Sequence, residues 1–425
     1  MSTHPSVLLL LGPTPWEGPL VAGLAHPSSR VVIERRCLDT ADLLAAASSG
    51  LARVAVVGAD APRLDADVLA RLASLGVQLV AVVAADDQEA SLRLRRWGVE
   101  SVVAVDPTEL GAAVRALADA VVRAARADGK VPLPATAAPE EVGSGRVVAV
   151  WGPVGAPGRT SLAIGVADEA ARSGCPALVI DADTWGASVA LVLGVVDDSA
   201  GLASACRRAL GGTLDPSSLA ALAREVAPGL SVLPGLPRAG RWTEVRAAAM
   251  TEVLSVARGC ADLVVVDCGF SLEADEELVF DTEAPRRNAA TFAALAAADV
   301  VLAVGSADPV GLVRLVSGLA DLDEVVPGTA RRVVVTRLRA SILGKRGEAS
   351  VAAALHRHAG IESVCCVPDD RAAYDAALRG GRTVAQVAPG SPARAAIRSL
   401  TRELLRDLGL DRAPGLSGLG SAGTA

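Results

Sequence analysis

The chain has 425 residues, enough for two or three domains at about 100–200 residues each. Hydrophobic residues make up 51% and charged residues 21%, which excludes a globally disordered chain because full apolar cores can form. The formal net charge is -7 and aromatic residues are only 2%, so neither a basic footprint nor an aromatic stacking surface for nucleic acid is expected.

The first part of the chain alternates short apolar, β-branched runs with segments of helical periodicity. Continuous apolar strands separated by amphipathic helices indicate a parallel sheet that is covered on both faces. Five such units predict a flavodoxin-like domain over residues 1–126. The predicted strands are 7–11, 30–36, 53–57, 79–83 and 101–105, and the predicted helices include 41–47, 65–74, 89–97 and 108–126.

A second α/β domain is predicted over residues 146–410. Its expected strands are 146–151, 177–180, 230–233, 263–266, 300–304, 332–335 and 364–367. The segment before it, 127–145, is rich in Pro, Gly, Ala and Glu without a periodic apolar pattern, which predicts a linker. Residues 411–425 are mostly small or polar and predict a disordered tail. The expected fold class is therefore two doubly wound, parallel-sheet α/β domains.

The first domain resembles the receiver domain of response regulators but departs from it at the residues that carry phosphorylation. That family needs an acidic pair after the first strand, an Asp after the third and a Lys after the fifth. Here Gly12, Pro13 and Thr14 follow the first strand, Asp60 lies two positions late, and Asp106 stands near the place of the Lys. Without an acidic cluster no Mg²⁺ site would neutralise a phosphoryl group. We expect a docking or dimerisation module.

The second domain begins with the order strand, glycine-rich loop, helix, strand that is typical of a P-loop. Gly158-Arg159-Thr160 opens the helix, and the next apolar run ends in Asp181 and Asp183. In such a loop, backbone amides and the helix N-terminus converge on phosphate oxygens. Thr160 is placed to bind Mg²⁺. The predicted site is therefore a phosphate site with a metal.

The match to the general P-loop pattern G-x-x-x-x-G-K-[ST] is incomplete. The pattern requires Gly at position 153, which is Pro153, and Lys at position 159, which is Arg159. A planar guanidinium does not replace a compact ammonium without a rearrangement. An ordinary βα turn rich in Gly and Pro is the alternative. Asp267, which follows the apolar run 263–266, favours the nucleotide site, because a strand ending in a carboxylate holds the Mg²⁺ shell through water in P-loop proteins.

These motifs resemble the MinD/ParA class of P-loop ATPases, whose loop reads K-G-G-x-G-K-[ST]. On that pattern Val154 replaces the signature Lys, and the residues that would bind the cofactor ATP are Gly155, Ala156, Pro157, Gly158, Arg159, Thr160 and Ser161. The resemblance implies that Asp183 positions the attacking water. It also implies that Thr160, Asp181 and Asp267 hold Mg²⁺, the two acids through water. Thr336, followed by Arg337, stands where the family has an Asn that reads adenine, and Pro368 would flank the base.

The loss of the signature Lys has a predicted cost. In the resembled class this Lys reaches across a dimer to the partner's phosphates, and Val154 cannot supply that contact. A loss of about 3 kcal/mol of transition-state stabilisation slows a reaction about a hundredfold. We therefore expect weak nucleotide binding with slow or absent hydrolysis. Arg159 is the candidate to recover phosphate charge, in its own site or across the dimer.

The whole-chain organisation resembles the CpaE/TadZ branch of the class, in which a degenerate receiver-like domain precedes a MinD-like ATPase. That branch is associated with Tad-type pilus or secretion loci, and some members are labelled septum-site-determining proteins. The resemblance implies a homodimer, with pilus, secretion or division proteins as partners, membrane association only through those partners, and no direct nucleic-acid contact. The alternatives are a pseudo-ATPase scaffold without nucleotide turnover and a ParA-like chromosome partitioning protein.

The remaining features of the sequence bear less directly on the predicted site. The seven cysteines form no C-x-x-C pair and no apolar run reaches the ~18–20 residues of a membrane helix, so a cytoplasmic protein is expected, at a pole or septum only through partners. The acidic segment 273–283 is expected to be solvated, and His356 and His358 are not expected to bind metal. Helix 393–408 is expected to pack on the sheet rather than on a membrane. The sequence does not decide whether Trp151, Trp185 and Trp242 line the site or pack in the core.

Overall fold

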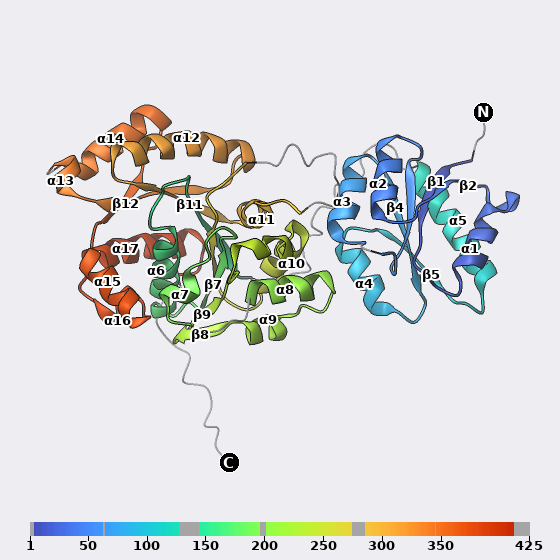
Figure 1. Cartoon of the computed structure of the whole chain (residues 1–425), viewed down its shortest axis with the longest axis horizontal. Helices are drawn as coiled ribbons and strands as arrows, with labels where there is room; N and C mark the ends of the chain where they lie inside the picture. Colours follow the sequence, from blue (N-terminus) through green and yellow to red (C-terminus); the bar gives the residue numbers. More distant parts are fainter. Residues whose placement is uncertain are drawn as a thin grey trace, which may run out of the picture. The chain divides into compact units, whose positions relative to one another are not determined.

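The computed structural model describes residues 4–62, 64–126, 144–195, 201–273, 285–344 and 346–411. The linker predicted at 127–145, the tail predicted at 411–425 and the acidic segment 273–283 lie outside these ranges except for their edge residues. The chain divides into an N-terminal and a C-terminal unit, each with its own sheet (Figure 1).

The N-terminal unit is a five-stranded parallel sheet in the order β2-β1-β3-β4-β5, the order of flavodoxin-like folds. The prediction of five βα units is confirmed. The strands are β1 (Ser6–Leu10), β2 (Val32–Arg36), β3 (Val54–Gly58), β4 (Gln78–Ala84) and β5 (Ser101–Val105). The helices are α1 (Glu17–Ala25), α2 (Thr40–Ser48), α3 (Ala66–Ser74), α4 (Gln88–Arg96) and α5 (Leu110–Arg126).

Side chains of the central strands alternate between two cores, as the pleat of a strand requires. Val54 and Val56 enter the core under α1 and α5, whereas Ala55 and Val57 enter the core under α2, α3 and α4. The edge strand β2 begins two residues later than predicted. Arg30 adopts a left-handed conformation with φ 56°, which is incompatible with an extended strand.

The C-terminal unit is an eight-stranded sheet in the order β13-β12-β11-β6-β10-β7-β9-β8. All pairs are parallel except β8 with β9. The seven predicted strands are present, and β8 was not predicted. The strands are β6 (Arg146–Trp151), β7 (Ala177–Ala182), β8 (Arg224–Ala227), β9 (Leu230–Leu233), β10 (Leu263–Cys268), β11 (Val300–Ser306), β12 (Arg331–Leu338) and β13 (Val364–Pro368).

Helices cover both faces of this sheet, as expected for a doubly wound fold. The core on one face contains side chains from α8 (Gly201–Leu210), α9 (Pro216–Leu222), α10 (Ala247–Ala257), α11 (Ala289–Ala297), α12 (Pro309–Val325) and α14 (Gly347–Ala359). The core on the other contains side chains from α6 (Arg159–Arg172), α7 (Val189–Val192) and α17 (Pro392–Asp407). The remaining helices are α13 (Ala340–Leu343), α15 (Arg371–Gly380) and α16 (Val384–Val387).

The C-terminal helix α17 packs inward, which confirms the expectation for residues 393–408. Ile397, Leu400, Leu404 and Leu405 are buried in the core shared with α6. The approach is close, because a Cβ added to Gly165 of α6 would lie 3.1 Å from the Ile397 side chain. In the part of the chain that the structure describes, no helix combines the length and apolarity needed to cross a membrane.

Strand register places three loops at one edge of the C-terminal sheet. Val150 of β6 pairs with Asp267 of β10, and Asp267 pairs with Asp181 of β7. Since the three strands are parallel, the segments that follow them meet at the same edge. The predicted phosphate loop and the two predicted metal acids are therefore neighbours.

Candidate nucleotide-binding site

The loop between β6 and α6 requires glycine at three positions. Gly155 and Gly158 have φ of 74° and 96°, the left-handed region in which side chains are strained. A Cβ on Gly152 would overlap the backbone carbonyl of Val304 in β11. Gly158 also precedes Arg159, the first residue of α6. The sequence therefore fixes a tight turn that brings the backbone to the helix start.

Where this turn meets α6, backbone amides without partners in the helix face away from it. The amide of Ala156 donates to the carbonyl of Pro153 at 3.0 Å, and Pro153 and Pro157 have no N–H to donate. The first N–H groups of a helix lack intrahelical acceptors and carry the positive end of its dipole. The start of α6 at Arg159 therefore presents backbone donors of the kind that bind anions.

Asp267 lies beside this helix start as a buried carboxylate without a compensating partner. It is 1% exposed, and neither carboxylate oxygen makes a hydrogen bond of normal geometry with a described residue. Burial raises the pKa of Asp267 well above its usual value, and the charge of Asp181 raises it further. The hydroxyl of Thr160 and the charge of Arg159 act in the opposite direction. A buried carboxylate in this state is destabilising unless a cation or water reaches it.

The donor set fits Mg²⁺ better than a closed metal centre. The described residues contain no group of three or more His, Cys, Asp or Glu side chains that would hold a metal by themselves. Mg²⁺ in nucleotide sites takes a hydroxyl, phosphate oxygens and water, with one or two carboxylates in support. Thr160, whose hydroxyl lies 3.3 Å from that of Ser188, and the unsatisfied Asp267 supply that chemistry.

Asp181, the second predicted metal acid, is occupied by the backbone of the segment that follows β7. Its oxygens accept hydrogen bonds from the amides of Asp183 at 3.3 Å and Val189 at 2.9 Å. Burial raises the pKa of Asp181 above its usual value, the Val189 hydrogen bond lowers it, and the charge of Asp183 raises it further. These contacts hold the start of α7, and they leave Asp181 to reach any metal through water rather than directly.

Asp183, the predicted water-positioning residue, lies next to Arg159. One carboxylate oxygen accepts the amides of Trp185 at 2.9 Å and Gly186 at 3.2 Å, and the other lies 3.8 Å from the Arg159 guanidinium. Both charged side chains are largely buried, at 13% and 16% exposure. The two predicted catalytic residues are therefore brought together as an ion pair at the loop.

Arg159 points into its own loop. Its guanidinium donates to the carbonyls of Gly152 at 3.0 Å and Pro153 at 3.4 Å, in addition to the ion pair with Asp183. Of the two roles considered for Arg159, this geometry matches the charge of its own site rather than a contact across a dimer. The guanidinium occupies loop acceptors that lie beside the predicted phosphate position.

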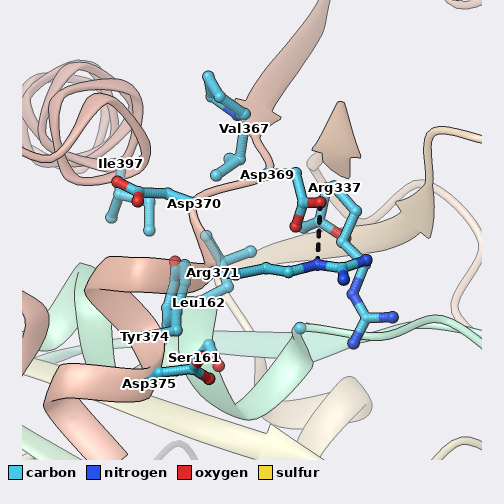
Figure 2. A pocket seen from close by; sticks show the side chains of 13 residues that line it. Ser161, Leu162, Arg337, Val367, Asp369, Asp370, Arg371, Tyr374, Asp375 and Ile397 are labelled. Carbon is cyan, nitrogen blue, oxygen red and sulfur yellow. Dashed lines mark ion pairs between the residues drawn. The ribbon is translucent and has the colours of Figure 1, made fainter. Parts of the chain in front are cut away.

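A cavity of about 300 Å³ adjoins the helix start and contains the residues predicted to contact the base (Figure 2). Its lining includes Gly158, Ser161, Thr336, Arg337 and Pro368. Figure 2 shows Arg371 extended toward Asp369, with which it forms an ion pair at 3.4 Å. A pocket of this size beside the N-terminus of a helix can hold a small molecule such as a nucleoside.

Thr336 meets the loop directly. Its hydroxyl lies within hydrogen-bond distance of the carbonyls of Pro157 at 2.7 Å and Gly305 at 3.1 Å. A Cβ on Gly158 would lie 3.3 Å from the Thr336 methyl group. Its hydroxyl hydrogen is thus committed to backbone acceptors. The neighbouring Arg337 has φ 57°, an uncommon conformation for a non-glycine residue that ends the regular register with β13.

The tryptophans that the sequence left open have different environments. Trp151 is 1% exposed and donates from its indole to the Phe270 carbonyl at 3.1 Å, so it belongs to the core. Trp242 packs partly buried against the same core. Trp185 is 41% exposed beside Asp183, with the guanidinium of Arg287 4.2 Å from its ring centre. It therefore lies at the edge of the site.

The structure also brings a residue to the loop that the motifs did not indicate. Arg314 of α12 donates to the carbonyl of Val154 at 3.5 Å. Residues 154 and 314 are 160 positions apart, so no local pattern signals the contact. In the sequence, Arg314 is distinguished only as the one charged residue in the first half of this helix, which is otherwise apolar.

Two positions of the N-terminal unit that the receiver comparison singled out now have defined contacts. Gly12 lies against the backbone of Asp60, where a Cβ would overlap the Asp60 carbonyl. Asp106 accepts hydrogen bonds from the amide of Thr108 at 2.8 Å and from its hydroxyl at 2.6 Å, and these contacts lower the pKa of Asp106. Asp106 therefore serves a turn before α5.

No model of a known protein family matches the sequence, and no curated protein matches it. Solved structures do. A ParA family ATPase from Chlorobium tepidum TLS is 18% identical, with a TM-score of 0.50 over 60% of this chain and 98% of its own. The septum site-determining protein MinD of Pyrococcus horikoshii OT3, complexed with Mg-ADP, is 17% identical, with a TM-score of 0.49 over 63% and 98% of the two chains.

The match to the ParA family ATPase is a likeness of fold. It extends over 60% of the chain, more than the N-terminal unit contains, so it includes at least part of the C-terminal unit. At this identity the likeness does not transfer an activity. The C-terminal unit, with its doubly wound sheet and its loop between β6 and α6, therefore has an α/β fold like that of this ParA family ATPase.

Proposed function

We propose that the chain is an ATP-binding switch of the MinD/ParA type, with Mg²⁺ as its metal and with slow or absent hydrolysis. The observation that carries the proposal is Asp267, a buried and unsatisfied carboxylate at the end of β10, beside Thr160 and the start of α6. A cation supplied with a nucleotide would compensate this charge. The fold likeness to a ParA family ATPase supports the same assignment.

The residues have separate proposed roles. The amides of Gly155, Gly158, Arg159 and Thr160 hold the phosphates, with Ala156 and Pro157 shaping the turn and Ser161 behind it. Thr160 binds the metal, which neutralises charge on the terminal phosphates when it is bound, and Asp267 and Asp181 orient its water shell. Asp183 holds the attacking water, and Arg159 supplies charge. Arg337, Pro368 and the Thr336 backbone border the base.

Slow turnover follows from two features of the loop. Val154 is uncharged and 55% exposed, so the loop carries no cation at its outer position. Arg159 is held by the carbonyls of Gly152 and Pro153, and it must give up these bonds to contact a phosphate. Each hydrogen bond to a charged group is worth about 1.5–3 kcal/mol, so both features raise the barrier.

The finer proposal is a CpaE/TadZ-like positioning factor. In it, nucleotide favours a homodimer that recruits pilus, secretion or septum proteins, and membrane or polar localisation comes only through those partners. The N-terminal unit serves as the docking or dimerisation module, and its flavodoxin-like strand order supports this role. A partner is recruited by nucleotide only if it distinguishes the bound from the empty state.

The proposal is tested by calorimetry with Mg-ATP and Mg-ADP, alongside light scattering, on the full chain. Wild type should bind with a 1:1 stoichiometry and change its oligomeric state with ATP. Thr160→Ala should lose affinity at least tenfold, whereas Thr213→Ala, an exposed threonine far along the chain from the loop, should not. Absence of binding together with an unchanged oligomer would contradict the proposal.

A pseudo-ATPase scaffold is the second candidate, and one observation favours it. Arg159 already donates to loop carbonyls and pairs with Asp183, so the loop is internally paired. In the scaffold, nucleotide has no effect on partner binding, which the same titrations detect. A ParA-like partitioning role is a weaker alternative because of the net charge of -7, and salt-sensitive binding of duplex DNA would support it.

A further inference from the structure

Helix α12 contacts the loop between β6 and α6 at two positions, Pro153 and the Val154–Gly155 backbone. A Cβ on Gly318 would lie 3.0 Å from the Pro153 side chain, so the helix backbone comes close to the loop there. Arg314, four residues earlier and therefore on the same helix face, donates to the Val154 carbonyl. A Cβ on Gly155 would overlap the Arg314 guanidinium, and would lie 3.4 Å from its central carbon. The guanidinium thus rests on the loop backbone.

The helix that carries Arg314 is held in place by its own start and its core side. The carboxylate of Asp308 caps α12 and accepts the amide of Gly311 at 2.9 Å. A Cβ on Gly311 would lie 2.6 Å from the side chain of Ser306, so α12 sits tightly on the end of β11. Leu315 and Leu319 are buried in the core. Arg314 is therefore presented to the loop by a fixed element rather than by a mobile segment.

The charge of Arg314 is not compensated by any described carboxylate. Its one hydrogen bond in the described structure is to the Val154 carbonyl, and its side chain is exposed. Arg159, by contrast, is largely buried and paired with Asp183. The outer loop residues 153–157 are all uncharged. Arg314 therefore brings a positive charge to this part of the loop.

We propose that Arg314 contacts the terminal phosphate of a nucleoside triphosphate and so makes the site distinguish a triphosphate from a diphosphate. The inference rests on the proposed nucleotide site. A guanidinium binds phosphate oxygens through two N–H groups at once, which suits a terminal group with free oxygens. The Val154 contact is long for a hydrogen bond, so the guanidinium exchanges it readily for an anion.

The test is the affinity of the full chain for Mg-ATP and Mg-ADP in wild type, Arg314→Ala, Arg314→Lys and Arg357→Ala. Arg357 is an exposed arginine on α14 and serves as the matched control. Arg314→Ala should weaken ATP binding about tenfold and ADP binding less than about threefold. Arg314→Lys should recover part of the loss, and Arg357→Ala should leave both affinities unchanged. Thermal unfolding of each variant, without nucleotide, should match wild type.

The outcomes separate the inference from the proposed function. If wild type binds nucleotide but Arg314→Ala weakens ATP and ADP equally, or neither, the assignment of Arg314 to the terminal phosphate is wrong and the nucleotide site stands. If wild type binds neither nucleotide, the proposed function fails and the inference fails with it. A preferential loss of ATP that Arg314→Lys partly restores supports both.

Discussion

Replacing Asp267 by Asn should affect the empty and the nucleotide-bound protein in opposite directions. The substitution keeps the shape of a side chain that is 1% exposed but removes its charge. If Asp267 supports a metal through water, its loss removes a charge-assisted interaction worth about 1.5–3 kcal/mol. At 1.4 kcal/mol per tenfold, Mg-ATP affinity should fall about 10- to 150-fold.

The empty protein should not be destabilised by the same change. Asp267 has no hydrogen-bond partner among the described residues and lies beside a second buried carboxylate, Asp181. Because burial raises the pKa of Asp267, the folded wild type binds this proton more tightly than the unfolded chain. Its stability therefore decreases as the pH rises from the unfolded value through the raised pKa. In Asp267→Asn this decrease should be smaller, and the free energy of unfolding at pH 8 should hold or rise.

Two assays measure both effects. Chemical denaturation between pH 5 and 8 without nucleotide gives the stability, and calorimetry with Mg-ATP gives the affinity. Asp119→Asn, at an exposed position of the N-terminal unit, is the control for removal of one negative charge. A variant that loses stability at pH 8 while keeping its Mg-ATP affinity would refute the reasoning, because Asp267 would then be a structural residue.

Three further predictions concern the loop, the core and the N-terminal unit. Gly158→Ala should lower the free energy of unfolding by about 1–2 kcal/mol, because φ is 96° and the added Cβ meets Thr336, whereas Gly240→Ala, in open space, should change it by less than about 0.5 kcal/mol in urea denaturation. Ile397→Ala should cost about 2–5 kcal/mol by the same measurement, and a loss below 1 kcal/mol would contradict the packing of α17 on α6. Acetyl phosphate should not modify Asp60 in the wild-type chain, and a phosphorylated Asp60 in mass spectrometry would overturn the docking-module proposal.

The sequence predicted those parts of the fold whose signal is local. Twelve strands followed from continuous apolar runs, and each lies in one of the two sheets. Strand β8 was missed because it is short, lies at an edge, and none of its residues is fully buried, so Arg224–Ala227 shows no apolar run. It forms an antiparallel hairpin with β9 through Gly229, whose φ is 73°.

In the candidate site, too, the residues with a local signal were predicted and those positioned by tertiary contacts were not. The loop residues and the strand-end acids were found because each lies in a short motif, and strand register brings Asp181, Asp267 and the loop together. The direction of Arg159, into its own loop, depends on neighbours such as Asp183 that no motif describes. Arg314 was not found because its contact with Val154 depends on the packing of α12. The role of each residue remains a proposal.

The most direct measurement is a crystal structure of the full chain with Mg²⁺ and a non-hydrolysable ATP analogue. It should show phosphate oxygens on the amides at the start of α6. A six-coordinate metal should lie about 2.0–2.1 Å from the Thr160 hydroxyl, with a metal-bound water on Asp267. A nucleotide bound elsewhere, or a loop that remains closed by Arg159 with Asp267 still dry, would contradict the account.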